Sequence, residues 1–497
     1  MNNILYKSTR GGEESVCASE AILKGIAKDG GLFVPNEIPK LVKNFEEISN
    51  MNYREVAFEV MSKFLTDFTE DELRNCIDNA YNEKFDTEAI APLEKVGDEY
   101  FLELYHGPTL AFKDMALSIL PHLMTTSAKK QKTDKEIVIL TATSGDTGKA
   151  ALEGFSDVEG TKIIVFFPQE GVSEVQRMQM VTHKGENTTV VGIKGNFDDA
   201  QSAVKNIFTS NEFNKLLNDN GYVFSSANSI NIGRLIPQVA YYVYTYALLL
   251  KKGEIEKDEK INVVVPTGNF GNILAAYYAK QMGTPIDKLI CASNDNKVLY
   301  DFITTGTYDK EREFHITNSP SMDILISSNL ERLLYFVSGE NCETVNKLMK
   351  DLKDKGAYNI SDDMKKNIAD FIGGYSNEKN TLESIKDVYD NEGYLMDTHT
   401  AVAYAVYKDY KNKSNDKNKS VIISTASPYK FTVSVMNALD EKYIGVDDFE
   451  LVREMEKLTS ITIPDGIKDI EKREIVHKRI CEKTKIDEEV KDILKLK

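Results

Sequence analysis

The chain has 497 residues, of which 41% are hydrophobic, and this is enough for two or three domains around a large buried core. Its 78 acidic and 61 basic residues give a formal net charge of −17, which argues against non-specific binding to nucleic acids or anionic membranes. A local basic pocket for a small anion is still compatible with this charge.

Residues 1–12 are polar and lack the apolar core of a signal peptide, and the apolar run from Ile236 to Leu250 is too short to span a bilayer. The five cysteines, at positions 17, 76, 291, 342 and 481, are far apart and form no C-x-x-C pair. The six histidines are dispersed and form no H-E-x-x-H motif. We therefore expect a cytoplasmic protein without disulfide bonds and without a structural or catalytic metal.

Three regions of different composition follow one another along the chain. Residues 1–99 mix apolar clusters with acidic helical patterns such as Thr69 to Tyr81, which predicts a mainly helical domain in a supporting role. Residues 100–440 alternate short β-rich runs with helical patterns, which is typical of βαβ units and an α/β fold with a parallel sheet. Residues 441–497 are charge-dense with scattered apolar residues, which predicts a helical extension packed on the main body.

Lys113 is the first residue of the α/β region with a distinctive environment. It follows Phe112 in the run His106-Gly-Pro-Thr-Leu-Ala-Phe-Lys-Asp-Met-Ala, so that apolar side chains flank its amine. Partial desolvation would lower the pKa of this amine and favour the neutral nucleophile. Most lysines are solvated surface groups, however, and the flanking residues alone do not establish a chemical role.

Three polar loops each follow a predicted strand. The strands are Glu136 to Thr141, Ile261 to Val265 and Ser420 to Ser424, and their loops cover residues 142–148, 266–272 and 425–430. Helical patterns follow the first two loops, and a further strand is predicted at 162–167. Ligands of open α/β sheets bind at the carboxyl ends of the strands. We expect the first two loops to lie in one sheet, at one ligand site.

The loop Gly268-Asn-Phe-Gly271 has the composition of a phosphate cradle. Its glycines allow the backbone to approach an anion, and the following helix offers unpaired N–H groups at its positive end. The alternative is an ordinary strand-to-helix turn. The tripeptide recurs at Gly195-Asn-Phe197, but Asp198 and Asp199 follow it and would repel a phosphate, so we predict a turn or a helix cap there. The loop at 142–148 suits a carboxylate or a second phosphate, or else it is a capped turn.

These motifs together resemble the threonine synthase family of fold-type II pyridoxal-phosphate enzymes. The resemblance rests on HGPTLAFKD around Lys113 and on further motifs in the order expected for that family. These are Tyr6-x-Ser-Thr-Arg-Gly11, GGLFVP at 30–35, TATSGDTG at 141–148, SSANSINIGR at 225–234, PTGNFGN at 266–272 and STASPYKF at 424–431. It implies two subdomains with open parallel sheets and helices on both faces within residues 100–440, and an active site between the subdomains.

The resemblance also implies a role for each motif. Lys113 would bind pyridoxal 5'-phosphate as a Schiff base and later act as the base, Phe112 would lie beside the cofactor, and Thr425 would face the pyridine nitrogen. The cofactor phosphate would be held by Gly268, Asn269, Phe270, Gly271 and Asn272. The amino-acid end of the substrate would be bound by Thr143, Ser144, Gly145, Asp146 and Thr147. The substrate phosphate would be bound by Arg234, in a site lined by Asn228, Ser229 and Asn231.

Two of these assignments have structural alternatives. Thr425 is also what a strand end would use to satisfy backbone groups, and Arg234 could form a plain ion pair. Two motifs depart from the family pattern: Ser427 and Tyr429 stand where the family often has histidine and alanine, and Asp397-Thr-His-Thr400 lacks a proline. These departures affect the expected substrate pocket and not the cofactor motifs.

The activity implied by the resemblance is conversion of O-phospho-L-homoserine and water to L-threonine and phosphate, by γ-elimination and addition of water at Cβ. The protein would act as a monomer or homodimer on this small substrate. Two alternatives stay open. The same fold serves phospho-lyases and threonine or serine dehydratases, and a protein of this fold could be a catalytically idle binding protein.

Overall fold

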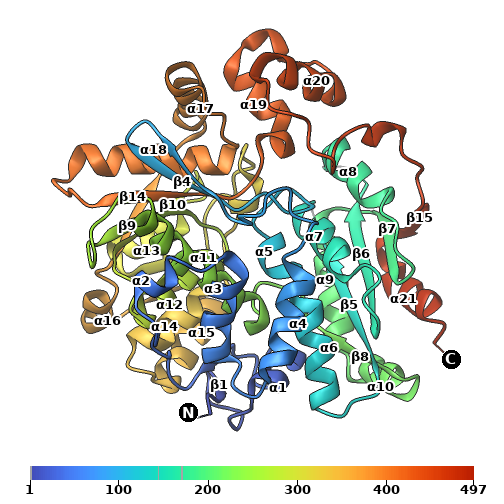
Figure 1. Cartoon of the computed structure of the whole chain (residues 1–497). Coiled ribbons are helices and arrows are strands. Elements are labelled where there is room, and N and C mark those ends of the chain that lie inside the picture. The colour runs from blue at the N-terminus through green and yellow to red at the C-terminus, as the bar shows by residue number, and fades with distance from the viewer. Residues whose placement is uncertain (1–2, 144, 170–171, 497) are drawn as a thin grey trace.

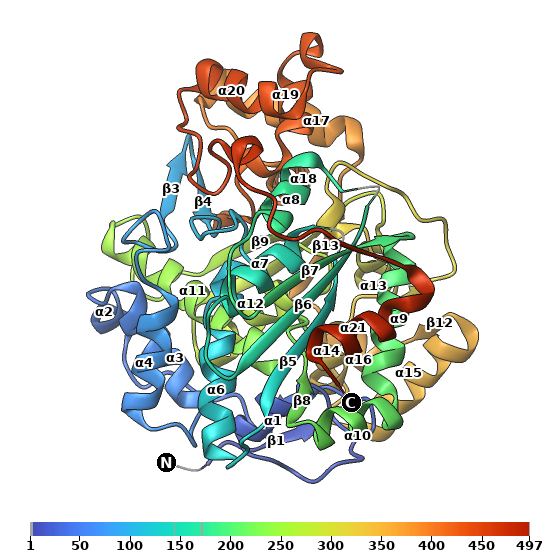
Figure 2. The same ribbon diagram turned by 90° about the vertical axis from the view of Figure 1, so that its right-hand side faces the viewer.

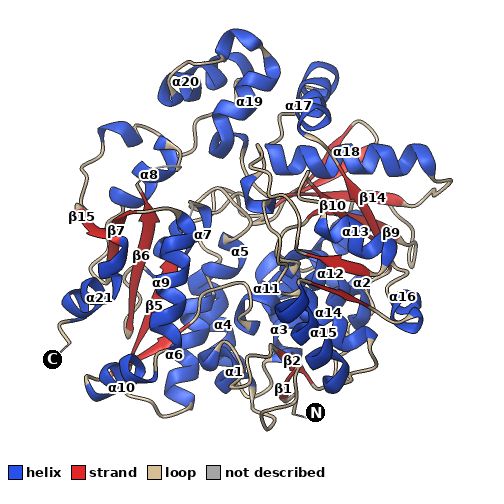
Figure 3. Cartoon of the chain, turned by 180° about the vertical axis from the view of Figure 1, so that it is seen from behind, coloured by secondary structure: helices blue, strands red, loops and turns tan. Residues whose placement is uncertain are grey.

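The computed structural model describes residues 3–143, 145–169 and 172–496. Within these residues the strands form a six-stranded sheet, a five-stranded sheet and two separate two-stranded sheets. Figures 1 and 3 show the two large sheets on opposite sides of the molecule, with helices between them and around them. The predicted class, an α/β fold with open parallel sheets and helices on both faces, is confirmed.

The six-stranded sheet has the strand order β13-β10-β9-β14-β4-β3. Neighbouring strands are parallel except β3 and β4, which form an antiparallel hairpin. In this order the strands cover Phe371–Tyr375, Ile286–Ser293, Ile261–Pro266, Lys419–Ser424, Glu99–Glu103 and Leu93–Val96. Strands β9 and β14 match the strands predicted at 261–265 and 420–424, and the sheet begins before residue 100 because it includes β3.

The five-stranded sheet has the order β15-β7-β6-β5-β8, and all of its neighbouring strands are parallel. In this order the strands cover Arg479–Glu482, Thr188–Lys194, Thr161–Pro168, Glu136–Ala142 and Tyr222–Ser225. The carboxyl-terminal segment therefore contributes an edge strand to this sheet as well as helices. Figure 2 shows this segment running from the top of the molecule across the sheet to α21.

The expectation that loops 142–148 and 266–272 belong to one sheet is wrong. The first follows β5 in the five-stranded sheet and the second follows β9 in the six-stranded sheet. Both sheets repeat the same strand–helix pattern, and that pattern does not say which strands are neighbours. Each loop instead contacts Ser321, the first through Asp146 and the second through Gly268.

The regular elements of the first 99 residues are mostly helices, and Thr69 caps α4 with a reciprocal pair of hydrogen bonds to Glu72, as the helical pattern at 69–81 predicts. The elements of this region that precede β3 are β1 (Tyr6–Ser8), α1 (Ala18–Lys24), β2 (Phe33–Pro35), α2 (Phe45–Ile48), α3 (Tyr53–Phe64) and α4 (Glu70–Ala80).

The other helices and two short strands connect and cover the large sheets. Up to α11 they are α5 (Asp114–Leu117), α6 (Leu120–Lys130), α7 (Asp146–Phe155), α8 (Glu174–Val181), α9 (Phe197–Thr209), α10 (Asn211–Asp219) and α11 (Ile232–Lys251). Further along are α12 (Gly271–Met282), α13 (Val298–Thr305), β11 (Thr307–Asp309), α14 (Leu330–Val337), α15 (Cys342–Lys355), β12 (Ala357–Asn359), α16 (Asp362–Asn367), α17 (Glu378–Glu392) and α18 (Thr398–Lys413). The last are α19 (Thr432–Leu439), α20 (Asp448–Thr459) and α21 (Ile486–Leu494), and short 3-10 helices occur at Pro320–Met322, Pro428–Phe431, Glu441–Tyr443, Ile470–Lys472 and Lys483–Lys485.

Helix α11 is the central helix of the main core. It packs against α3 and α12, and nearly every one of its side chains is buried although Pro237 interrupts its backbone hydrogen bonds. This burial explains why the sequence of α11 is apolar all round. Of the helices that the structure describes, α11 included, none has both the length and the apolar character needed to cross a membrane.

Candidate active site

The loop that carries Lys113 is held against the end of β14 by backbone contacts. Ala111 bridges to Ala426, and the Phe112 N–H donates to the carbonyl of Thr425 over 2.8 Å. The loop is braced internally by Asp114, whose carboxylate accepts hydrogen bonds from the backbone N–H and the hydroxyl of Thr109. Lys113 is thus fixed at the carboxyl end of a strand from the six-stranded sheet.

The amine of Lys113 is buried and points toward Asp146, which follows strand β5 of the five-stranded sheet. Its Nζ lies 3.3 Å from Asp146 Oδ2, at the start of α7, and 3.3 Å from Ser321 Oγ. Burial lowers the pKa of this lysine; the Asp146 carboxylate opposes that effect, while the nearby Lys430 and Arg234 charges add to it, and the pKa lies below its ordinary value. The lowered pKa favours the neutral amine, as the sequence around Lys113 predicts.

Asp146 is surrounded by hydrogen-bond donors and ammonium groups. Its Oδ2 also accepts from Ser321 Oγ (3.0 Å), and its Oδ1 accepts from Gln176 Nε2 (2.9 Å) and forms an ion pair with Lys430 Nζ (3.2 Å). Burial raises the pKa of this carboxyl, but the charges of Lys430 and Lys113 outweigh burial and hold the pKa well below its usual range. Asp146 is therefore ionised and fixed in orientation.

The rest of the loop at 142–148 is shaped by Thr143 and two glycines. Thr143 Oγ1 accepts from the N–H groups of Gly145 (2.9 Å) and Gly148 (3.0 Å), so this hydroxyl orders the turn. Gly145 has a φ of 150°, and a Cβ on it would lie 2.7 Å from the Gln176 side chain. Thr147 is half-buried, and the predicted site residue Ser144 lies outside the described residues.

The predicted phosphate cradle lies between β9 and α12. Phe270 has a left-handed backbone with a φ of 63°, and Gly268 approaches the neighbouring chain so closely that a Cβ on it would lie 2.7 Å from the Ser321 carbonyl oxygen. The backbone carbonyls of Gly268 and Asn269 are occupied by Ser327 Oγ (2.7 Å) and the Asn329 N–H (3.1 Å). Because these carbonyls accept hydrogen bonds from Ser327 and Asn329, the N–H groups at the start of α12 are left for an anion.

Asn272 is held in the first turn of α12 by two tyrosine hydroxyls. Tyr241 and Tyr242 each donate to Asn272 Oδ1 over 2.6 Å. Asn272 Nδ2 is buried and has no hydrogen-bond partner within the part of the chain that the structure describes. A buried donor of this kind costs free energy unless a ligand or water accepts from it.

Sequence reasoning missed the segment 317–329, which touches both the lysine and the cradle. Ser321 contacts Lys113, and Ser327 and Asn329 contact the cradle. The carboxylate of Asp323 holds the segment in place through Thr317, Asn294 and Asn296. The segment is rich in Ser and Asn and has neither helical nor strand periodicity, so the only signal in the sequence was loop composition.

The motif at 225–234 places its residues in different environments. Asn228 is exposed, and Ser229 lies 3.4 Å from the Asn329 amide. Asn231 is buried, and its side chain is used by the backbone of Ile22, Ser226 and Gly233. Asn231 therefore shapes the start of α11.

Arg234 is 4% exposed and is only partly satisfied. Its Nη1 donates to the Ala227 carbonyl over 2.9 Å, whereas its Nε has no partner among the described residues, and no carboxylate of those residues pairs with it. Burial lowers the pKa of this guanidinium to about 10, so it still carries its charge near neutral pH. The plain ion pair considered from the sequence is not observed.

The carboxyl end of β14 brings Thr425, Ser427 and Lys430 to the site. Thr425 is buried, and its N–H donates to the hydroxyl of Thr400 over 3.3 Å. Ser427 caps the following turn by accepting from the Tyr429 N–H, and the Tyr429 hydroxyl donates to the Ile461 carbonyl. Ser427 and Tyr429, which depart from the family pattern, thus both form hydrogen bonds within the fold.

His399 reaches the lysine site through Ser321. Its Nδ1 contacts Asp397 over 2.7 Å, and its Nε2 accepts from the Ser321 N–H over 3.1 Å. Because a backbone N–H can only donate, Nε2 is the unprotonated nitrogen and Nδ1–H donates to Asp397. Asp397 and His399 thereby fix the backbone of Ser321 beside Lys113.

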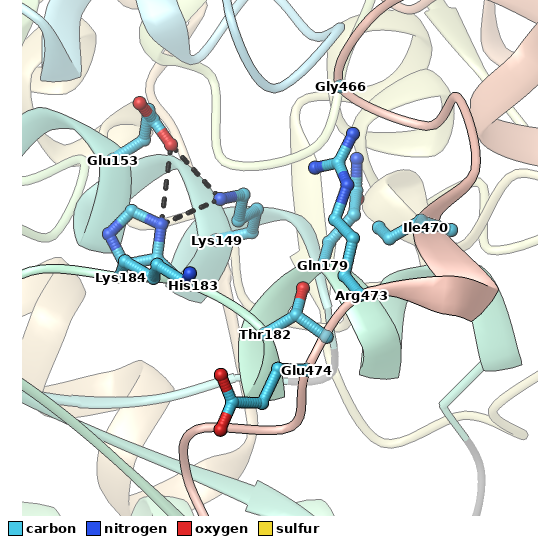
Figure 4. Close-up of a pocket in the computed structure, with 10 residues that line it drawn as sticks. All are labelled: Lys149, Glu153, Gln179, Thr182, His183, Lys184, Gly466, Ile470, Arg473 and Glu474. Carbon is cyan, nitrogen blue, oxygen red and sulfur yellow. Dashed lines mark hydrogen bonds and ion pairs between the residues drawn. The ribbon is translucent and has the colours of Figure 1, made fainter.

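A separate cavity of about 360 Å³ lies one helical turn behind the loop at 142–148, between α7, α8 and residues 466–474. Figure 4 shows Lys149 between Glu153 and His183 at one side of it, and Arg473 beside Gln179 at the other. Lys149 Nζ lies 3.0 Å from both Glu153 Oε2 and His183 Nδ1. None of the predicted site residues lines this cavity.

Three family models match the chain. The family described as "Threonine synthase N terminus" matches residues 5–81, "Pyridoxal-phosphate dependent enzyme" matches 87–427, and "Threonine synthase, C-terminal" matches 400–480. The middle match alone covers more than half of the chain and includes Lys113, the cradle and Thr425.

Similar proteins agree with these matches. A threonine synthase-like 1 of Pongo abelii is 41% identical over 451 residues, which cover 87% of this chain, and a threonine synthase of Schizosaccharomyces pombe is 36% identical over 88% of this chain and 90% of its own length. The chain spans about three fifths of the threonine synthase-like 1 relatives, 60% in the Pongo abelii protein. The crystal structure of a cofactor-bound threonine synthase from Brucella melitensis superposes with a TM-score of 0.88 at 35% identity, over 99% of both chains.

The lysine site at the ends of strands from two mostly parallel sheets, the family matches between residues 5 and 480 and the superposition all indicate the same family. The chain belongs to the threonine synthase family of pyridoxal-phosphate-dependent enzymes.

Proposed function

We propose that the protein converts O-phospho-L-homoserine and water to L-threonine and phosphate. The observation that carries this proposal is a buried amine, Lys113, close to a buried guanidinium, Arg234, that lacks a carboxylate partner among the described residues. The first group suits a carbonyl cofactor and the second suits a substrate phosphate. The names of the relatives support the same reaction.

The described residues fit pyridoxal phosphate. The close approach at Gly268 leaves no room for a Cβ, and the orphaned amide of Asn272 and the N–H end of α12 supply donors for a phosphate. We propose that Gly268, Asn269, Phe270, Gly271 and Asn272 hold that phosphate, that Phe112 lies beside the cofactor and that Thr425 faces its ring nitrogen. When bound, the cofactor supplies an electron sink that makes the substrate Cα proton acidic.

Lys113 has two proposed tasks. Its neutral amine would hold the cofactor through the carbonyl chemistry that the cofactor supplies, and the same amine would take the proton from the substrate Cα. The lowered pKa of Lys113 suits both tasks, because only the unprotonated amine can attack a carbonyl or accept a proton.

The substrate lies across the two subdomains in this proposal. Arg234 binds its phosphate by a charge-assisted hydrogen bond, with Asn228, Ser229 and Asn231 lining that end of the site. The loop that contains Thr143, Ser144, Gly145, Asp146 and Thr147 binds its amino-acid end. In the described part of this loop Thr143 acts through the backbone turn that it orders. Closure of the two subdomains over the substrate would exclude bulk water during the elimination.

The molecular context is part of the proposal. We propose a cytoplasmic enzyme that works as a monomer or homodimer, and the five free cysteines support a reducing location. We also propose three functional regions, an amino-terminal supporting domain at 1–99, the cofactor-binding region at 100–440 and a carboxyl-terminal extension at 441–497.

The test is a coupled assay of the full chain with pyridoxal phosphate and O-phospho-L-homoserine, in which phosphate and threonine are both measured. We expect equal amounts of the two products, and we expect Lys113→Ala to form neither product and to lack the visible absorbance of a lysine-bound cofactor. Lys413→Ala, which removes an exposed lysine paired with Asp409, is the matched control and should behave as the parent. Phosphate or 2-oxobutanoate without threonine would assign the chain to the lyases or dehydratases of this fold.

A further inference from the structure

Asp146 lies between the amines of Lys113 and Lys430. Its Oδ2 is 3.3 Å from Lys113 Nζ and its Oδ1 is 3.2 Å from Lys430 Nζ. The Lys430 side chain is 1% exposed, and its Nζ also donates to the Thr109 carbonyl in the loop that carries Lys113. Lys430 is therefore anchored to both the carboxylate and the lysine loop.

The remaining contacts of Asp146 keep it in this position. Ser321 donates to the oxygen that faces Lys113, and Gln176 donates to the oxygen that faces Lys430. With both oxygens occupied, the carboxylate cannot rotate to give both oxygens to Lys113. A second cation on the far oxygen withdraws part of the negative potential that Lys113 would otherwise experience.

We propose that Lys430 is a positioning residue, which shares Asp146 with Lys113 and so limits how strongly that carboxylate holds the cofactor lysine as an ammonium ion. The inference rests on the assignment of Lys113 as the cofactor lysine in the proposed function. It gives Lys430 and Asp146 opposite effects on one amine: Asp146 favours the charged form, and Lys430 favours the neutral form that attacks the cofactor.

The other charged groups around Lys113 are present in all of the variants compared. Arg234 on α11 disfavours the charged amine, and the Asp114 carboxylate accepts from Thr109. His399 on α18 accepts from the Ser321 N–H and helps to lower the pKa of Asp146. Each of them is the same in every variant considered, so differences between variants report Asp146 and Lys430.

The experiment measures protonation of Lys113 in the full chain without cofactor. The protein is treated with trace isotope-labelled acetic anhydride at a series of pH values, and the labelling of the Lys113 peptide is followed by mass spectrometry. Lys430→Met should move the midpoint upward by about one pH unit, which is a roughly tenfold lower neutral fraction at a given pH below the midpoint. Asp146→Asn should move it downward, and Lys430→Arg should restore the parent midpoint.

The control is Lys442→Met, an exposed lysine paired with Asp440, which should leave the Lys113 midpoint unchanged. Lys430→Gln replaces Lys430→Met if the methionine variant does not fold, and Asp146→Asn tests the proposal independently of both. Midpoints that move in the same direction in the two kinds of variant, or no movement in folded variants, overturn the proposal. The readout needs neither cofactor nor substrate, so failure of the threonine assay and failure of this inference are distinguishable.

Discussion

Arg234 and Arg332 show how two buried arginines come to differ in chemical availability. Arg332 donates to the carbonyls of Phe33 and Ile230 and to the Asn329 side chain, so its guanidinium is used inside the fold. Arg234 gives one hydrogen bond to Ala227, and its Nε is without a partner across the residues that the structure describes. Each guanidinium nitrogen of Arg332 therefore has a partner within the fold, whereas Arg234 keeps one buried nitrogen, Nε, for an anion.

Replacing Arg234 by glutamine should weaken binding of the phosphate end of the substrate. A hydrogen bond to a charged group contributes about 1.5 to 3 kcal/mol, so KM should rise roughly tenfold to a hundredfold. The measurement is initial-rate kinetics with O-phospho-L-homoserine at saturating cofactor. Arg177→Gln, on the surface beside Glu174, is the control, and an unchanged KM in Arg234→Gln would remove this arginine from the phosphate site.

Residue types in a motif do not say which atoms remain free, and this limits prediction at the residue scale. Thr143 and Asn231 lie in the loops where the sequence places them, but their side-chain atoms are taken by neighbouring backbone groups. Whether a hydroxyl or amide binds ligand or backbone depends on distances of a few tenths of an ångström, and those distances follow from packing.

The two copies of Gly-Asn-Phe show how elements give one tripeptide two uses. In the first copy Asn196 caps α9 through a reciprocal pair of hydrogen bonds with Asp199, which confirms the prediction of a turn or helix cap. In the second copy Asn269 precedes a left-handed residue at the start of α12, and no side-chain cap is formed there. Asp199, which follows the first copy, closes the helix end that the second copy leaves open.

Substitution of Asn196 and of Asn269 by alanine should distinguish the helix cap from the phosphate cradle. Asn196→Ala should lower the free energy of unfolding by about 1 kcal/mol, as expected for a lost cap, and leave cofactor affinity unchanged. Asn269→Ala should weaken cofactor binding about tenfold, because the cradle loses one polar contact. Urea unfolding and titration with pyridoxal phosphate measure the two effects, and equal cofactor affinity in both variants would contradict the cradle assignment.

Regular elements were predictable and the irregular segment 317–329 was not. Short runs of β-branched residues followed by turn residues predict strands such as β5 and β9. The segment 317–329 is ordered by hydrogen bonds that the Asp323 carboxylate accepts from Thr317 within the segment and from the more distant Asn294 and Asn296. Such contacts leave no periodic pattern in the sequence.

The whole molecule brings together segments that are far apart in the chain. Strand β15, from the carboxyl-terminal extension, pairs with β7 almost 300 residues earlier and completes the five-stranded sheet seen in Figure 2. The candidate active site joins Lys113, Asp146, Ser321 and Lys430 from four separate stretches. Correct assembly of the two sheets is therefore a condition for the site.

A partly buried histidine, His122, should make the whole fold sensitive to acid. Burial lowers the pKa of His122 to about 4, below the ordinary value of 6.5, so the unfolded chain binds a proton more readily between these values. Stability is therefore fully present above about pH 6.5 and is lost as the pH falls toward 4. This histidine contributes a slope of at most about 1.4 kcal/mol per pH unit.

His122→Phe should reduce the slope of unfolding free energy against pH by up to about 1.4 kcal/mol per pH unit, which corresponds to one bound proton. The measurement is the free energy of urea unfolding of the cofactor-free protein between pH 6.5 and 4.5. The exposed His315→Gln is the control variant. A slope in His122→Phe equal to that of the parent would show that His122 is not the source of the acid sensitivity.

The sequence by itself determined the α/β class, the strands and loops around Lys113 and the cradle, and the family to which the chain belongs. These follow from local patterns, since periodicity, turn residues and contiguous motifs are written along a few neighbouring residues. The tertiary structure decided that the two polar loops belong to different sheets, that Ser321 and Lys430 meet Lys113 and Asp146, and that Arg234 keeps an unused donor. These depend on which distant segments pack together, and the free energy of that packing comes from the whole core, so no single stretch of sequence encodes it.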